Sequence, residues 1–190
     1  MPYETREATV SELKELYDAF LVPYFPAAER KPYFAIRRMM QTGHYRFLTL
    51  ADETGTVGIA AVTGCPETDL LLLDYLAVRE DARSGGIGAK LLKVCRDFAG
   101  DRPMIIETED IDLMETAAEK AQCARRNAFY ARNGAVPTGV KTRMFGVPFC
   151  NSLLADGRPA TDDEVRQAIA ALYAFMIGNR LVYDKCVVIG

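Results

Sequence analysis

Leu70 to Val78 is a stretch of nine residues that is apolar at every position except Asp74. Such a nearly continuous apolar run predicts a strand that is buried on both faces. Three glycines follow, and then apolar residues recur at the spacing of one helix face: Ile87, Leu91, Leu92, Cys95 and Phe98. The sequence therefore predicts a sheet with a helix beside it, joined by a glycine-rich junction.

This junction has the chemistry of an anion site. Unpaired N–H groups at the start of a helix attract anions, and glycines allow a phosphate to approach the backbone closely. Arg83 and Lys90 bring positive charge to the same region. We therefore expect the junction to bind a phosphorylated ligand.

Two common phosphate-binding loops do not fit the spacing. A Walker A loop requires a Ser or Thr directly after its lysine, but Leu91 follows Lys90 here. The dinucleotide fingerprint requires a third glycine three residues after the second, and that position is again Leu91. A nucleotide-binding enzyme is therefore disfavoured.

Two other patterns occur in order along the chain. The first is Arg83-x-x-Gly86-x-Gly88 at the strand-to-helix junction, and the second is Phe129-Tyr130 followed by Gly134 at the end of a later helical segment. Together they resemble the two signatures of the GCN5-related N-acetyltransferase (GNAT) family. The resemblance covers roughly residues 3 to 146.

The resemblance implies an α/β (α+β) fold with a mixed, mostly antiparallel sheet flanked by helices on both faces. We expect residues 1–150 to form the acetyltransferase domain. Residues 151–190 are expected to add a helix, capped by Thr161, and strands at 181–183 and 187–189. Forty residues cannot easily bury that much apolar surface alone, so this extension packs on the same domain or on a second copy in a homodimer.

The family binds acetyl-CoA as its acyl donor, so the same ligand is expected here. Its phosphates would lie against the junction, and its pantetheine arm against the end of the apolar strand, where the N–H of Leu76 would face the thioester carbonyl. The residues assigned to donor binding are Leu76, Ala77, Val78, Arg83, Ser84, Gly85, Gly86, Ile87, Gly88 and Ala89.

Tyr130 aligns with the family tyrosine that protonates the departing thiolate. Many relatives have an asparagine seven residues earlier, where this chain has Cys123. The amine must also lose a proton, and Glu107 is the preferred base, with Glu109 and His44 as alternatives. Glu107 and Glu109 alternate on one predicted strand, Met104 to Glu109, and so share a face.

These residues predict an N-acetyltransferase that acts on a primary amine of a small molecule. The amine of a protein N-terminus or of a lysine side chain is an alternative acceptor. Glu109 and Glu29 are the candidate acceptor-binding residues. The alternative is a non-catalytic acyl-CoA-binding or interaction module on the same fold, in which Cys123 replaces the expected asparagine.

Composition excludes several other classes. The chain has 190 residues, 49% of them hydrophobic, and a net charge of −3, so neither a nucleic-acid nor an anionic-membrane partner is expected. Its five cysteines are dispersed and odd in number, which favours a reducing cytoplasm over a disulfide framework. With a single histidine and no C-x-x-C, no metal site is expected.

Overall fold

A computed structural model describes residues 3–83, 85–157 and 159–190. The described strands form an eight-stranded sheet in the order β1-β2-β3-β4-β5-β7-β6-β8. The sheet is mixed and mostly antiparallel, as predicted. Two compact units divide the chain: Met1–Thr63 with Leu73–Gly100, and Gly64–Leu72 with Asp101–Gly190.

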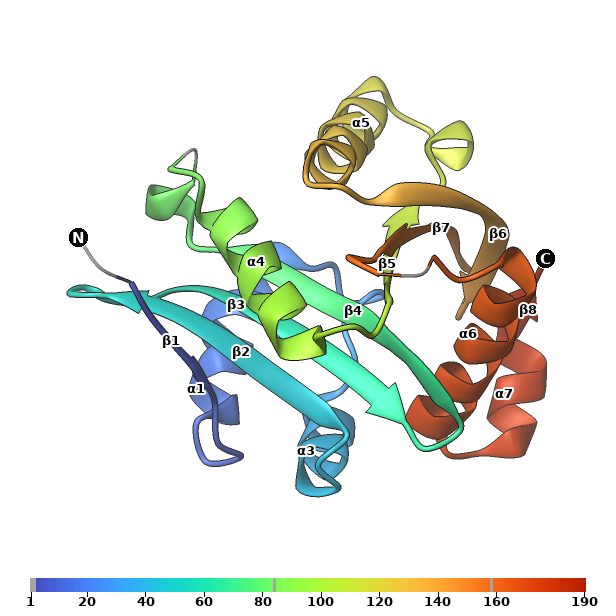
Figure 1. Cartoon of the computed structure of the whole chain (residues 1–190), viewed down its shortest axis with the longest axis horizontal. Coiled ribbons are helices and arrows are strands. Elements are labelled where there is room, and N and C mark those ends of the chain that lie inside the picture. The colour runs from blue at the N-terminus through green and yellow to red at the C-terminus, as the bar shows by residue number, and fades with distance from the viewer. Residues whose placement is uncertain (1–2, 84, 158) are drawn as a thin grey trace. The chain divides into compact units, whose positions relative to one another are not determined.

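The first unit is built on β1, β2, most of β3 and the second half of β4. In Figure 1, α4 covers one face of these strands, and α1 and α3 lie on the opposite face. The elements are β1 (Glu4–Glu7), α1 (Leu13–Leu16), the π-turn η1 (Tyr17–Leu21), α2 (Val22–Tyr24), α3 (Tyr33–Gln41), β2 (Tyr45–Asp52), β3 (Gly55–Cys65), β4 (Thr68–Val78), the 3₁₀ turn η2 (Glu80–Ala82) and α4 (Ile87–Ala99).

A helix on each face means that the central strands of this unit are buried on both sides. Every residue of β3 from Val57 to Thr63 is buried. A glycine within this run, Gly58, allows α4 to approach, because a Cβ there would lie 2.6 Å from Leu91 Cδ1. The predicted apolar face of α4 therefore packs directly on β3.

The second unit contains the later strands and the helices around them. Besides the first half of β4, its elements are β5 (Met104–Glu109), the 3₁₀ turn η3 (Ile111–Leu113), α5 (Ala117–Arg132), β6 (Val136–Met144), β7 (Val147–Leu154), α6 (Asp162–Ile177), α7 (Arg180–Cys186) and β8 (Val187–Ile189). β7 pairs with both β5 and β6, and β8 pairs with the outer edge of β6.

The pattern from Arg143 to Cys150 predicts one strand with an interruption at Gly146-Val147-Pro148, but the structure has two strands there. β6 ends at Met144 and β7 begins at Val147, and the pair forms an antiparallel hairpin. The two turn residues, Phe145 and Gly146, have φ of 50° and 86°. Two-residue hairpin turns of the favoured kind require positive φ at both positions, so Phe145 and Gly146 form the turn, and Val147 and Pro148 belong to β7.

The C-terminal extension begins as predicted but then departs from the prediction. Thr161 caps α6 and Gly178 ends it with a φ of 64°. Residues 181–183, predicted as a strand, belong to α7 instead. The side chain of Asn179 accepts a hydrogen bond from the N–H of Val182, at 3.2 Å, and this local cap starts a helix where the apolar residues alone suggested a strand.

The extension belongs to the same compact unit as β5, β6 and β7. Position 150 lies inside β7, so the strand continues across the boundary drawn from the sequence. One side of α6 is buried, and it contributes Val165, Ala168, Ile169, Leu172, Tyr173 and Met176. None of the described helices is both long and apolar enough to cross a membrane.

Candidate active site

The junction after β4 forms a helix start suited to an anion. Gly86 is the N-cap of α4 with φ 75° and ψ 8°, a left-handed conformation that glycine adopts without steric strain. Among the described residues no side chain caps this helix, and its first backbone hydrogen bond runs from the N–H of Lys90 to the carbonyl of Gly86, at 3.1 Å. The N–H groups of the first turn lack intrahelical partners and can bind an external anion.

Gly86 also leaves open space beside the helix start. A Cβ built on it would have no heavy atom within 4 Å. Gly88 and Ala89 follow in the first turn of the same helix, together with the buried Ile87. Ser84, the remaining polar residue assigned to donor binding, lies outside the described residues.

Arg83 is held at the end of β4. Its Nε donates a hydrogen bond to the carbonyl of Val78 at 3.2 Å, and its guanidinium lies 4.7 Å from the centre of the Tyr24 ring. The Tyr24 hydroxyl in turn accepts a hydrogen bond from the N–H of Glu80, at 3.1 Å. Tyr24 therefore supports the turn that precedes the glycines. No sequence signal indicated this contact, because Tyr24 and Glu80 are 56 positions apart in the chain.

The strand residues assigned to donor binding alternate between the two faces of β4. Ala77 is buried, and its carbonyl oxygen would lie 3.1 Å from a Cβ on Gly58. Leu76 and Val78 point to the other face and are half-buried. Packing therefore fixes this end of β4 through Ala77.

A buried carboxylate that the sequence analysis did not single out anchors the segment around Glu29. Asp74 of β4 is only 5% exposed and pairs with Lys31, whose Nζ lies 2.6 Å from Oδ1. The Tyr45 hydroxyl donates to the other oxygen of Asp74. The lone charge in the apolar run from Leu70 to Val78 was the signal that could have revealed this anchor.

The next residue of the strand, Tyr75, adds two hydrogen bonds to the same segment. Its hydroxyl donates to the carbonyl of Glu29 at 3.0 Å and accepts from the N–H of Lys31 at 2.8 Å. Burial and the negative charge of Asp74 hold the pKa of the neighbouring Tyr45 well above its usual value, so Tyr45 is a hydrogen-bond donor. The backbone of Glu29 is therefore fixed against β4.

In the second unit, Glu107 of β5 is held by two hydroxyl groups. Tyr173 of α6 donates a hydrogen bond to Oε1, and Thr142 of β6 donates to the same oxygen at 3.3 Å. Tyr173 is fully buried, and Thr142 is 4% exposed. Two buried side chains thus fix the position of the candidate base.

Glu109, two residues along the same strand, has a different environment. Its carboxylate forms a salt bridge with Arg126 of α5, and its carbonyl accepts a hydrogen bond from the Cys123 thiol at 3.0 Å. Burial and the nearby carboxylate raise the pKa of Cys123, so the thiol stays protonated at neutral pH. Cys123 therefore joins α5 to β5, which favours a structural role over a nucleophilic one.

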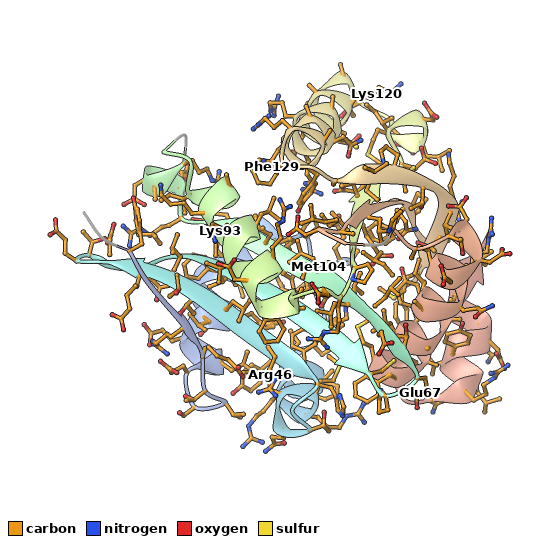
Figure 2. All side chains as sticks on the ribbon, in the orientation of Figure 1. Arg46, Glu67, Lys93, Met104, Lys120 and Phe129 are labelled. Carbon is orange, nitrogen blue, oxygen red and sulfur yellow. The ribbon has the colours of Figure 1, made fainter. Side chains whose placement is uncertain are left out.

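Tyr130 lies near the end of α5, which Lys120 and Phe129 mark at its two ends in Figure 2. Tyr130 is half-buried, and its ring packs against that of Phe129 with centroids 5.1 Å apart. The helix ends as the sequence predicts, with Gly134 at φ 94°. The Tyr130 carbonyl accepts hydrogen bonds from the N–H groups of Asn133 and Ala135 at this end.

His44 precedes β2, and its carbonyl accepts a hydrogen bond from the Thr63 hydroxyl at 3.2 Å. Within the described residues, no group of three or more His, Cys, Asp or Glu side chains could hold a metal ion.

Comparisons with known proteins agree with the two signatures. Residues 43–134 match the family model of the acetyltransferase (GNAT) domain. The fold is similar to that of a GNAT-family protein from Bacteroides thetaiotaomicron, with a TM-score of 0.73 and 19% identity over 93% of this chain and 99% of that chain. No curated protein matches the sequence.

Two solved structures of enzymes with more specific names are also similar. The aminoglycoside 6′-N-acetyltransferase from Enterococcus faecium has a TM-score of 0.61 and 19% identity over 83% of this chain and 99% of its own. The ribosomal-protein-S18-alanine N-acetyltransferase from Escherichia coli has a TM-score of 0.58 and 15% identity over 85% of this chain and 98% of its own. At these identities the similarity concerns the fold.

Residues 43–134 thus match the GNAT acetyltransferase domain, and the chain has the fold of GNAT acetyltransferases, as the two signatures predict. This domain match and fold support acyl transfer as the general class of reaction.

Proposed function

We propose that this chain transfers an acetyl group from acetyl-CoA to a primary amine of a small molecule. The observation that carries the proposal is the helix start at Gly86, which combines a left-handed glycine, an uncapped first turn and open space. This helix start lies within the part of the chain that matches the acetyltransferase domain.

Acetyl-CoA fits this helix start because its pyrophosphate is an anion that needs several donors close together. The N–H groups of Gly86 to Ala89 supply such donors, and the helix dipole favours negative charge there. The backbone of Leu76 to Val78 is assigned to the pantetheine arm. The N–H of Leu76 is assigned to the oxyanion, a contact that is typically worth roughly 3 kcal/mol of barrier.

In the proposed reaction the amine nitrogen attacks the thioester carbonyl carbon, and a C–N bond forms. Glu107 accepts the proton that the amine loses, either directly or through water. Collapse of the tetrahedral intermediate breaks the C–S bond, and the Tyr130 hydroxyl gives its proton to the departing thiolate. The products are an N-acetylated amine and free CoA, and solvent restores both side chains to their starting protonation states.

Charge supports an amine acceptor. Glu29 and Glu109 are assigned to acceptor binding, although the salt bridge to Arg126 reduces the contribution of Glu109. The Enterococcus faecium relative is named for a small-molecule acceptor and the Escherichia coli relative for a protein, so both classes belong in a screen. The five dispersed cysteines favour the cytoplasm as the place of action.

The test is CoA release from acetyl-CoA in the presence of amines of three kinds: aminoglycosides, amino-acid amides, and peptides with a free N-terminus or lysine. With an accepted amine, Tyr130→Phe should lower kcat by about 10² and leave acetyl-CoA binding unchanged. Tyr183→Phe is the matched control, because Tyr183 is also a half-buried tyrosine on a helix.

Three results would contradict parts of the proposal. Full kcat in Tyr130→Phe would remove Tyr130 from the mechanism. Acetyl-CoA binding without amine-dependent CoA release would favour the non-catalytic acyl-CoA-binding module. Failure of acetyl-CoA at millimolar concentration to raise Tm would reject donor binding altogether.

A further inference from the structure

Two successive layers of hydrogen-bonding side chains hold Glu107 in the second unit. The first layer consists of Tyr173 and Thr142, which both donate to Oε1 of Glu107. The second is Asn151 of β7, whose Nδ2 donates to the Thr142 hydroxyl at 3.3 Å and to the Val140 carbonyl at 3.2 Å. All of these residues lie in the second unit.

The direction of these hydrogen bonds follows from the chemistry of the groups. The Thr142 hydroxyl has a single hydrogen, and because it accepts from Asn151, that hydrogen is available for Glu107. An ionised carboxylate can only accept, and Tyr173 supplies the second donor. The network therefore holds Glu107 as an acceptor in one orientation.

Burial makes this orientation rigid. Tyr173 is 0% exposed, Asn151 1% and Thr142 4%, so water cannot readily replace any of these donors. The strand register agrees, because Glu107 lies directly across from Asn151 in the β5–β7 pair. Inside a protein, hydrogen bonds that are linked in this way fix their members more strongly than separate hydrogen bonds do.

Neighbouring charged groups have other partners. Glu109, on the same strand, pairs with Arg126 of α5. Lys141, beside Thr142 on β6, pairs with Asp110, whose Oδ2 lies 2.7 Å from its Nζ. Two uncharged hydroxyls are among the groups that hold the Glu107 carboxylate, and both contact Oε1.

These residues lie outside the part of the chain that matches the acetyltransferase domain, which ends at residue 134. Tyr173 comes from α6, whose capping box and buried face were predicted from sequence without any role in the site. We propose that Tyr173 and Thr142 are positioning residues that orient Glu107 to accept the proton of the amine. This inference rests on the proposed function, in which Glu107 is the base.

The experiment measures kcat and KM for acetyl-CoA and for an accepted amine in matched variants. Tyr173→Phe and Thr142→Val should lower kcat by roughly tenfold or more and leave KM for acetyl-CoA unchanged, because only the orientation of the base is altered. Thr142→Ser keeps the hydroxyl and should retain most of kcat. Thr49→Val is the control, since Thr49 is a buried strand threonine that loses an ordinary hydrogen bond to the Arg6 carbonyl.

A double mutant separates positioning from stability. In the Glu107→Gln background, Tyr173→Phe should cause little further loss of kcat, because both changes act through the same carboxylate. If the Tyr173→Phe loss is equally large in that background, or if Tyr173→Phe has full kcat, the positioning role is wrong. No CoA release by the unaltered protein with any amine would count against the proposed function instead.

A crystal structure of Tyr173→Phe beside that of the unaltered protein tests the inference without activity. The expected result is a Glu107 carboxylate that has rotated or occupies more than one conformation. A carboxylate in the same single orientation in both proteins would overturn the proposal, even if the protein has no transferase activity.

Discussion

Gly58→Ala tests the close packing that fixes α4, the helix that begins at the proposed phosphate site. A Cβ at this position would lie 2.6 Å from Leu91 Cδ1 and 3.1 Å from the carbonyl oxygen of Ala77. Leu91 is fully buried, so its methyl group has no open side to move toward. The Ala77 oxygen belongs to β4 and cannot move without the strand. The added methyl group must therefore push α4 away from β3.

Overpacking of this kind costs about 1–3 kcal/mol. For a chain of this length, each kcal/mol lowers Tm by roughly 2–4 °C, so the expected loss is about 2–12 °C. Differential scanning calorimetry at one pH measures the change. The matched control is Gly157→Ala, where the nearest atom to the new Cβ, the carbonyl oxygen of Asp101, is at 4.0 Å.

Gly157→Ala should leave Tm unchanged or raise it slightly, because alanine lowers the entropy of the unfolded chain. If Gly58→Ala has the same Tm as the control, α4 and β3 do not pack as tightly as described. A lower Tm combined with an unchanged KM for acetyl-CoA would show that the helix start tolerates displacement of α4.

Two further predictions concern the glycine turn and the N-terminal strand. Gly86→Leu should lower the affinity for acetyl-CoA more than tenfold, and the protein should stay folded because no heavy atom lies within 4 Å of the new Cβ. The control is Gly100→Leu, at the other end of α4, where φ is also positive. Equal affinities of the two variants in calorimetric titration would contradict the assignment of Gly86 to donor binding. Hydrogen bonds from Arg6 and Thr9 lower the pKa of Glu12 from 4.5 to about 2. The ionised Glu12 side chain therefore contributes fully to stability above pH 4.5, and this contribution is lost as the pH falls toward 2. The Tm difference between the unaltered protein and Glu12→Gln should shrink over that pH range. A Tm difference that does not depend on pH would refute this prediction.

Local sequence signals were sufficient to predict the structure at positions where the backbone conformation or a helix cap requires one particular type of residue. Three such signals lie where the sequence predicts them: Gly86, which has a left-handed backbone conformation at the start of α4, Gly134 after α5, and the capping box at Thr161. Each of these signals depends on the geometry of its own few residues. The order of strand, glycine turn and helix follows from the same kind of information.

Local signals failed where two patterns compete over a short distance. The apolar residues 181–183 fit a strand, but the Asn179 cap favours a helix, and the helix forms. The residues from Arg143 to Cys150 fit one interrupted strand, but the positive φ of Phe145 turns them into a hairpin. Periodicity over three to eight residues does not distinguish these outcomes.

The amino-acid sequence by itself indicated the resemblance to GNAT acetyltransferases, the glycine helix start and the candidate roles of Tyr130 and Glu107, because these inferences depend on residue types at short, fixed spacings along the chain. Only the tertiary structure revealed that Asp74 anchors the Glu29 segment, that Cys123 joins α5 to β5 and that Tyr173 contacts Glu107. Tyr173 and Glu107 are 66 positions apart in the chain. Contacts over such separations depend on how strands pair and helices pack, and no local pattern encodes them.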